Sequence, residues 1–216
     1  INAPLSFEEG GQQLPYMIFN ATMFIMGAAN YSATAFPFLT AGASNLIRSF
    51  GTNQQKDYYL ENMYNGIWQG TMALTEPEAG SSLGDLTTLA QATDQDYYLI
   101  KGQKVFISCG DHDACDNIVH LMLARIEGAP KGTKGISLFI VPRMRADENG
   151  GLVFNDVKTG GIFHKMGYKG APITHLIMGE ESDCRGYLVG EAHQGLSYMF
   201  QMMNEARLFV GLQGLA

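Results

Sequence analysis

The sequence predicts a multidomain α+β fold with a partial amino-terminal helical bundle, an antiparallel β-barrel or sandwich, and the first helix of a carboxy-terminal bundle. Three observations support this prediction. Apolar residues recur at helical spacing in the first 64 residues, turn-separated short strands follow, and helical spacing returns at Glu191. Consecutive strands without helices between them are typical of antiparallel sheets. We therefore expect three regions, at residues 1–69, 70–190 and 191–216.

The first region contains three expected helices. Residues 14–30 carry apolar side chains at helical spacing with almost no polar face, so this segment should be buried in a bundle. Pro37 suits the first turn of a second helix that runs to about Phe50. Thr52 or Asn53 can cap the third helix.

The middle region contains eight expected strands. They are short and rich in β-branched and aromatic residues, and turn residues such as those of Pro130 to Lys134 lie between them. The expected strands cover residues 70–75, 86–93, 97–108, 117–126, 135–142, 151–157, 173–179 and 185–189.

The last region, residues 191–215, is expected to be one helix. Its apolar side chains form a single stripe at helical spacing, made by Leu196, Met199, Phe200, Met203 and Val210. A helix with such a stripe needs a partner, which favours the start of a further bundle.

Composition excludes several classes of protein. The net charge of −7 and the scattered basic residues argue against a nucleic-acid partner. Three cysteines without metal spacing indicate reduced thiols and a cytoplasmic location. The apolar stretch 14–29 contains Pro15 and Asn20 and lacks a basic flank, so no transmembrane segment is expected. The chain opens without methionine and reads like the middle of a longer protein.

The segment Met72–Ser82, MALTEPEAGSS, has the pattern of a ligand-binding loop. Its apolar start reads as the end of a strand. Pro77 then turns the chain, because it donates no ladder hydrogen bond and biases Glu76 away from helix. The small residues that follow let backbone amides and two hydroxyls approach a ligand. Such a loop suits a nucleotide or a thioester cofactor.

The segment Gln103–Gly110, QKVFISCG, reads as a strand with two different faces. A period of two places Phe106 and Ser108 on one face, and Val105 and Ile107 on the other. An aromatic ring beside a hydroxyl is a suitable platform for a planar heterocycle.

Four motifs together resemble, in order and spacing, those of the acyl-CoA dehydrogenase flavoprotein family: LTEPEAGSS, YLIKGQKVFISCG, GISLFIVPR and NEARLFVGLQGLA. The family pattern reads TEPxAGSD and then GxKxWITNG. The ordered set covers nearly the whole chain and is more specific than any single motif. Two further stretches resemble the long branch that includes 3-methylmercaptopropionyl-CoA dehydrogenases, namely HKMGYKG at 164–170 and GYLVGEAHQGLSYMFQMMNEAR at 186–207.

The resemblance implies roles for four flavin-binding residues. Leu74 and Thr75 match positions that offer backbone amides and a hydroxyl to the pyrimidine side of FAD. Phe106 stands where the family has tryptophan and Ser108 where it has threonine, so an aromatic face and a hydroxyl are kept. Cys109 replaces an asparagine without an evident reason in the sequence. Ordinary core or strand-end roles are the alternatives.

The resemblance also implies contacts to the substrate. Ser81 matches the serine that contacts the coenzyme A part, whereas Ser82 replaces the family's aspartate, which removes any contact made by that carboxylate. A turn-capping role for both serines is the alternative. Arg207 matches an arginine that supports the catalytic base. Glu205 is not expected to be that base, because relatives place theirs directly before the arginine, where this chain has Ala206.

The implied function is that of an FAD-dependent acyl-CoA dehydrogenase. Such an enzyme removes the α-proton of an acyl-CoA thioester with a carboxylate and passes the β-hydride to flavin. The usual glutamate base should lie beyond Ala216, so this portion alone should be inactive. Implied partners are the acyl-CoA substrate, an electron-transferring flavoprotein, and further copies in a homodimer or homotetramer. An acyl-CoA oxidase or flavin monooxygenase relative, and a non-catalytic ligand-binding or assembly module, are the alternatives.

Overall fold

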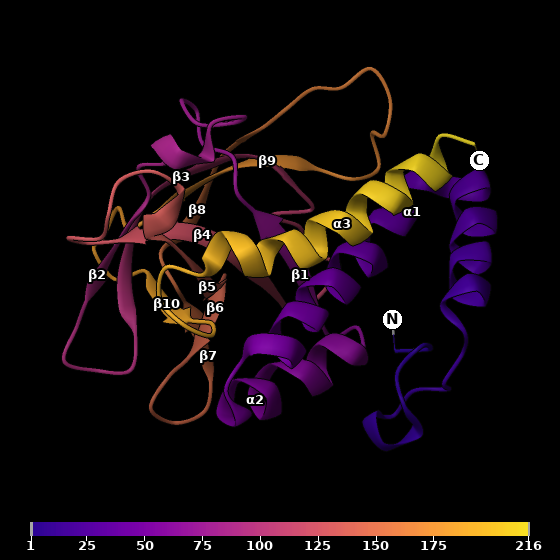
Figure 1. Ribbon diagram of the computed structural model, residues 1–216, viewed down its shortest axis with the longest axis horizontal. Coiled ribbons are helices and arrows are strands. Elements are labelled where there is room, and N and C mark those ends of the chain that lie inside the picture. The colour runs from indigo at the N-terminus through magenta and orange to yellow at the C-terminus, as the bar shows by residue number, and fades with distance from the viewer. Residues whose placement is uncertain (1, 216) are drawn as a thin grey trace.

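The computed structural model describes residues 2–215 and contains a β-barrel with long helices packed against one side (Figure 1). The helices are α1 (Tyr16–Phe50), α2 (Asn53–Tyr64) and α3 (Gly195–Gln213). The α1 and α2 helices precede the strands, and α3 follows them. The predicted α+β fold class, with helices before and after a β-region, is confirmed.

Ten strands form the β-region, between Trp68 and Leu188. Short 3₁₀ turns lie at Phe7–Glu9, Leu83–Asp85 and Thr133–Gly135. The strands are β1 (Trp68–Ala73), β2 (Leu89–Ala92), β3 (Tyr98–Ser108), β4 (Asn117–Ile126), β5 (Ile136–Pro142), β6 (Met144–Ala146), β7 (Leu152–Phe154), β8 (Val157–Ile162), β9 (Ile173–Met178) and β10 (Arg185–Leu188).

Five strands close the barrel in the order β4, β5, β10, β3 and β2, because β2 pairs with both β3 and β4. The β1 strand extends the sheet beside β4, and β9 and β8 extend it beside β3. Two pairs, β1 with β4 and β2 with β4, are parallel. The prediction of an antiparallel barrel is therefore corrected for these two strand pairs, which are parallel. The β2–β3 hairpin lies between β1 and β4 in the chain, so β4 can return alongside β1 in the same direction.

The helix boundaries in α1 differ from the predicted ones. The ribbon is continuous from Tyr16 to Phe50, with a kink at Asn30, where φ is −158° and ψ is 94°. The Asn30 carboxamide oxygen accepts a hydrogen bond from the backbone N–H of Ala33 at 3.1 Å. Asn30 therefore caps the second half of α1. Pro37 lies in the interior of that half, so the predicted start at Pro37 was wrong.

Most of the first half of α1 is exposed, and only Met23 and Gly27 in it are buried. Met17 is 81% exposed and Ile25 68% exposed, although the sequence predicted a helix buried inside a bundle. This half turns away from the barrel beyond the kink, and only the second half lies along the sheet (Figure 1). No helix within residues 2–215 is both long and apolar enough to cross a bilayer.

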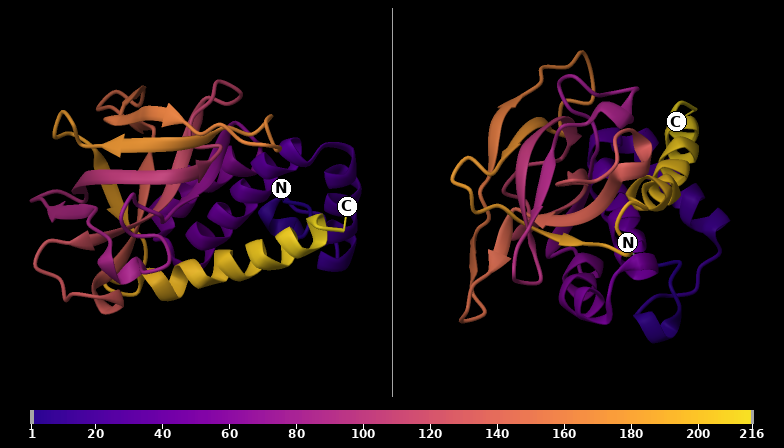
Figure 2. Two further views of the ribbon diagram at one scale, coloured as in Figure 1. Left: turned by 90° about the horizontal axis from the view of Figure 1, so that it is seen from above. Right: turned by 60° about the vertical axis from the view of Figure 1, so that its left-hand side comes forward.

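The buried face of α3 differs partly from the predicted stripe. Met199 is buried as expected, and Leu196 and Met203 pack against the core. Phe200 and Val210 are exposed, whereas Met202 and Phe209 are buried in their place. The helix contacts β5 at its start and then runs along α1, so its buried side is set by two successive neighbours (Figure 2).

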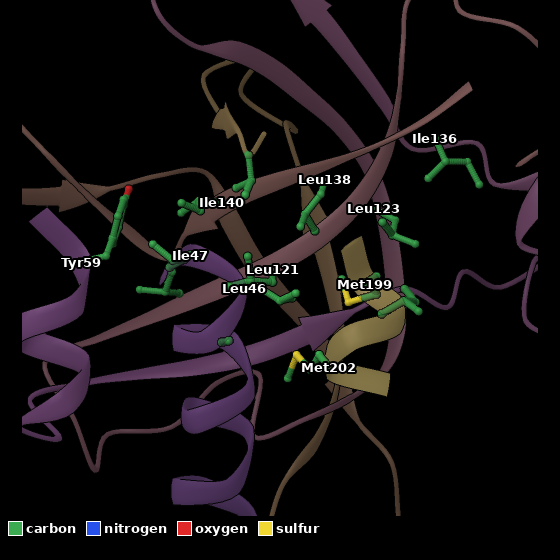
Figure 3. Packing of buried hydrophobic residues seen from close by; sticks show 14 of the residues in the cluster. Leu46, Ile47, Tyr59, Leu121, Leu123, Ile136, Leu138, Ile140, Met199 and Met202 are labelled. Atoms are coloured by element: carbon green, nitrogen blue, oxygen red, sulfur yellow. The ribbon is translucent and has the colours of Figure 1, made fainter. Parts of the chain in front are cut away.

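A hydrophobic core joins the helices to the outer face of the barrel (Figure 3). Leu46 and Ile47 from α1, Met199 and Met202 from α3, and alternate residues of β4 and β5 meet there. A second core fills the barrel itself, with Phe139, Met122 and Ile100 among its members. The β5 strand is buried at every residue, because its two faces line these two cores.

The predicted strand at residues 151–157 is two strands, β7 and the start of β8. Asp156 lies between them with φ of 53°, a left-handed conformation that turns the chain. The β7 strand pairs only with β6, in a separate two-stranded sheet. Neither β6 nor the Gly-containing part of β8 has a strong strand pattern, which explains their absence from the prediction.

Candidate functional site

The two segments singled out in the sequence lie side by side. The loop after β1 runs along the end of β3, where the backbone N–H of Val105 donates to the carbonyl oxygen of Thr75 at 2.9 Å. The Lys104 ammonium donates to the carbonyl oxygen of Leu74 at 3.0 Å. Leu74 and Thr75 are thereby held next to the strand that carries Phe106 and Ser108. A ligand can contact both segments only if they lie close together, and these hydrogen bonds show that they do.

Phe106 is presented to solvent by an irregularity in β3. The pairing of β3 with β9 shifts register between Lys104 and Ile107, and Phe106 has φ of 60°. A bulge of this kind re-aims a side chain. Phe106 is 60% exposed, while Val105 and Ile107 are buried. The Phe163 ring lies 4.5 Å from the Phe106 ring, centroid to centroid.

Hydrogen-bond donors beside this ring have no partner in the part of the chain that the structure describes. They are the backbone N–H groups of Leu74 and Thr75 and the hydroxyls of Thr75 and Ser108. Free donors beside an exposed aromatic face suit a planar heterocycle with acceptor atoms on its edge. The residues present therefore fit a flavin ring.

The two serines after Pro77, Ser81 and Ser82, make different contacts. The Ser82 hydroxyl donates to the carboxylate of Asp85 at 2.6 Å, so Ser82 stabilises the turn at η2. Ser81 is exposed and its hydroxyl has no partner within residues 2–215. At Gly80, the nearest atom to an added Cβ would be Thr75 Cγ2 at 3.7 Å, so the loop surface is open there. Of the two hydroxyls, that of Ser81 is available to a ligand.

The structure explains why asparagine suits the position of Cys109. Cys109 has φ of 54°, in the left-handed region that asparagine tolerates better than most residues. Its backbone N–H donates to the carbonyl oxygen of Pro172 at 2.7 Å, which fixes this conformation. Burial raises the pKa of the Cys109 thiol to about 12. The thiol is therefore a neutral packing group rather than a reactive thiolate.

His112 belongs to a hydrogen-bonded network that the sequence did not reveal. The backbone N–H of Ala114 donates to Nδ1 of His112 at 3.1 Å, which leaves Nε2 as the protonated nitrogen facing Oε1 of Gln69. Burial lowers the pKa of His112. The Phe36 ring of α1 packs edge-on against the imidazole at 5.1 Å. The network thus links α1, β1 and the loop after β3.

A second histidine, His120 on β4, is fully buried. Its Nδ1 lies 2.7 Å from the Thr71 hydroxyl of the neighbouring strand β1. Burial lowers the pKa of His120 from 6.5 to about 4. The folded protein therefore holds this imidazole neutral at pH values where the unfolded chain binds a proton.

We expect His120 to reduce stability on mild acidification. Below pH 6.5 the unfolded state takes up a proton that the folded state refuses, so the free energy of unfolding should fall until pH 4. The total loss should be about 3 kcal/mol. Denaturation midpoints measured from pH 7 to pH 4 test this. His120→Asn should flatten the profile and the exposed His164→Asn should not; equal slopes in both variants would contradict the assignment.

Arg207 does not lie near the two segments that carry Leu74 and Phe106. It is exposed, and Nη1 donates to the Asn204 carboxamide oxygen at 2.7 Å while the guanidinium lies over the Phe200 ring. Arg207 belongs to the later part of α3, which runs away from the barrel (Figure 2). Its predicted support of a catalytic base therefore stays a prediction.

Glu205 faces a cavity of about 430 Å³ between α1 and α3. Phe38, Gly42 and Asn45 of α1 line it, and Asn45 Nδ2 donates to Glu205 Oε2 at 3.4 Å. Burial raises the pKa of the Glu205 carboxyl. The β1 strand contacts the opposite face of α1, through Thr40. Glu205 and the cavity thus lie on the other side of α1 from β1.

Comparisons with known proteins agree on one family. A family model described as the middle domain of acyl-CoA dehydrogenases matches residues 71–180. A 3-methylmercaptopropionyl-CoA dehydrogenase from Ruegeria pomeroyi is 42% identical over 210 residues, which are 97% of this chain and 35% of that protein. A caffeyl-CoA reductase-Etf complex subunit from Acetobacterium woodii is 32% identical over 207 residues, covering 95% of this chain and 50% of that protein.

Among solved structures, butyryl-CoA dehydrogenase from Megasphaera elsdenii has the same fold. The TM-score is 0.83 at 24% identity, over 99% of this chain and 53% of that one. The chain thus spans about a third to a half of the length of these relatives.

Proposed function

Since the chain belongs to the acyl-CoA dehydrogenase family, we propose that it forms part of an FAD-dependent enzyme that oxidises an acyl-CoA thioester to the 2,3-enoyl-CoA. The observation that carries the proposal is the convergence of the β1 loop and the end of β3. Together they place an exposed aromatic ring beside free backbone and hydroxyl donors.

Leu74, Thr75, Phe106 and Ser108 would hold the isoalloxazine ring of FAD. Bound FAD would supply the acceptor for the hydride from the β-carbon, which carries both electrons of the oxidation. The N–H groups of Leu74 and Thr75 and the Thr75 hydroxyl would donate hydrogen bonds to one edge of the ring, and Phe106 would pack against it. Donors fixed in place before reaction favour negative charge on the ring, because they need not reorganise.

Ser81 would contact the coenzyme A part of the substrate, because its hydroxyl is exposed at the rim of the same loop. The carboxylate that removes the α-proton is proposed to come from outside residues 1–216, and Arg207 to lie near it in the complete protein. A nearby guanidinium favours the ionised form of a carboxylate base.

We extend the proposal to partners and organisation. An electron-transferring flavoprotein would take the electrons, and the name of the Acetobacterium woodii relative supports such a partner. We propose a homo-oligomer, a cytoplasmic location in keeping with three free cysteines, and domain limits at residues 1–69, 70–190 and 191–216. The 3-methylmercaptopropionyl-CoA dehydrogenase relative makes short acyl-CoA thioesters the first substrates to examine.

The proposed function is tested with the complete protein purified with its flavin. Without oxygen, a suitable acyl-CoA should bleach the visible absorbance of bound FAD, and the enoyl-CoA product should form in equal amount. A panel from short to long acyl chains, with the 3-methylmercaptopropionyl thioester included, covers the substrate range. The absence of bleaching with every member would refute the dehydrogenase proposal.

The same protein separates the alternatives. Rapid peroxide formation in air, in step with substrate consumption, would identify an acyl-CoA oxidase. Incorporation of oxygen into the product would identify a monooxygenase. Acyl-CoA binding without any product would identify a ligand-binding or assembly module.

A further inference from the structure

A buried ion pair lies directly beneath the proposed flavin loop. Lys104 Nζ and Glu76 Oε1 are 2.8 Å apart, and the side chains are 0% and 3% exposed. Charged side chains are rarely buried to this degree, because removing two ions from water costs several kcal/mol per ion. A buried ion pair often contributes little net stability, because the desolvation cost offsets the attraction. Its place beneath the loop therefore suggests a different role.

The Glu76 carboxylate is saturated with hydrogen bonds. Oε2 accepts from the backbone N–H of Thr87 at 2.6 Å and from the Thr87 hydroxyl at 2.8 Å. Oε1 accepts from the backbone N–H of Thr88 at 3.0 Å and from Lys104. Burial raises the pKa of Glu76, but the Lys104 charge and these bonds lower it further, so the net shift is downward. Glu76 thus joins the loop to the segment before β2.

Lys104 joins the same loop to β3. Its ammonium donates to the carbonyl oxygen of Leu74 as well as to Glu76, and both bonds are inaccessible to solvent. Burial lowers the pKa of Lys104 to about 8 and the Glu76 charge opposes this, so the ammonium keeps its proton at pH 7. The side chain cannot reach a bound ligand, because it is enclosed on all sides.

Several backbone carbonyls of the loop are already paired with other protein groups, and these pairings leave two of its N–H groups free. The carbonyl oxygen of Leu74 faces Lys104, and that of Thr75 faces the N–H of Val105. The N–H and C=O of Glu76 are paired with Ala79. With these carbonyls held inward, the N–H groups of Leu74 and Thr75 are left for a ligand. The carbonyl of Leu74 and the N–H of Thr75 belong to one peptide plane, so the bond from Lys104 sets the direction of the Thr75 N–H and holds the loop in place beside it.

We propose that Lys104 and Glu76 are positioning residues, which hold the Leu74–Thr75 donors against the edge of the flavin and so set its affinity and reduction potential. The inference rests on the proposed function, because it needs FAD at this loop. The sequence contains one signal for it, since Lys104 directly precedes the apolar residues VFI and Glu76 directly precedes Pro77.

The test compares Lys104→Met with the double variant Lys104→Met/Glu76→Gln in the complete flavoprotein. The single variant leaves a buried carboxylate without its cation and should unfold easily. The double variant removes both charges together and should recover most of the denaturation midpoint, because neutral replacement of a buried pair is often tolerated. Its FAD dissociation constant should still rise at least tenfold.

The reduction potential of the bound flavin is the second measurement, because a pair that only stabilised the fold would leave this potential unchanged. If the reduced flavin loses ten times more affinity than the oxidised flavin, the two-electron midpoint potential of the double variant falls by about 30 mV. Lys158→Met is the matched control, because Lys158 pairs with Glu180 and Glu181 at the surface. That variant should keep the FAD affinity and the potential of the parent protein.

The outcomes separate this inference from the proposed function. A stable double variant with unchanged FAD affinity and potential would refute the positioning role alone. A parent protein that binds no FAD would refute both. If the double variant does not fold, Thr87→Val replaces it, because it removes one hydrogen bond from Glu76 and keeps both charges. Its FAD affinity should fall about threefold, and an unchanged affinity would contradict the inference.

Discussion

Replacing Phe139 with alanine should lower the free energy of unfolding by about 4 kcal/mol, because large-to-small changes at a buried phenylalanine combine lost transfer energy with a cavity. Phe139 is fully buried inside the barrel. Its ring packs against Tyr98 in an edge-on geometry at 5.2 Å. Neighbouring strands β4 and β10 are fixed to β5 on both sides, so the site has little freedom to collapse.

Phe154→Ala is the matched control for this change. Phe154 lies in the two-stranded β6–β7 sheet and is 42% exposed, so the same truncation should cost less than about 1 kcal/mol. Chemical denaturation followed by circular dichroism measures both variants. Equal losses in the two would show that the barrel interior does not dominate stability.

Gly195→Ala should destabilise the protein by about 3 kcal/mol or more, at the upper end of overpacking costs. Gly195 is the first residue of α3, and a Cβ there would lie 2.3 Å from the carbonyl carbon of Ser137 and 2.4 Å from the nitrogen of Leu138. These are backbone atoms of β5 and cannot rotate away. The start of α3 must therefore separate from the barrel, and Met199 and Met202 lose their packing in the core.

The same substitution at Gly211 should have the opposite sign. Gly211 lies within α3, and an added Cβ would have no neighbour within 4 Å among the described residues. Alanine is favoured over glycine inside a helix by about 1 kcal/mol, so Gly211→Ala should raise the denaturation midpoint. A loss at Gly211 as large as that at Gly195 would contradict both expectations, because it would mean that the backbone contact is not what makes Gly195→Ala destabilising.

Local sequence patterns predicted most elements because each depends on neighbouring residues. Most strands follow from apolar runs between turn residues, and the start of α2 follows from a capping residue, which the structure shows to be Thr52. The pairing partner of each strand could not be predicted from these local patterns. The parallel β1–β4 pair and the barrel closure by β2 depend on contacts between residues far apart in the chain.

The site shows the same division. Motif order identified Leu74, Thr75, Phe106 and Ser108 as residues to examine, and the structure brings their two segments together. The bulge that exposes Phe106 and the network from His112 to Gln69 have no signature in a single sequence. Both depend on which backbone groups find partners when the sheet closes.

By itself, the sequence determined the family, the α+β class and the two segments of the candidate site, because these depend on residue order and local spacing. Only the tertiary structure decided that Asn30 rather than Pro37 begins the second half of α1, and that most of the first half is exposed. It also decided that Lys104 and Glu76 form a buried ion pair below the loop after β1. Burial and pairing are properties of the packed chain, since a residue's neighbours in space are set by the whole fold.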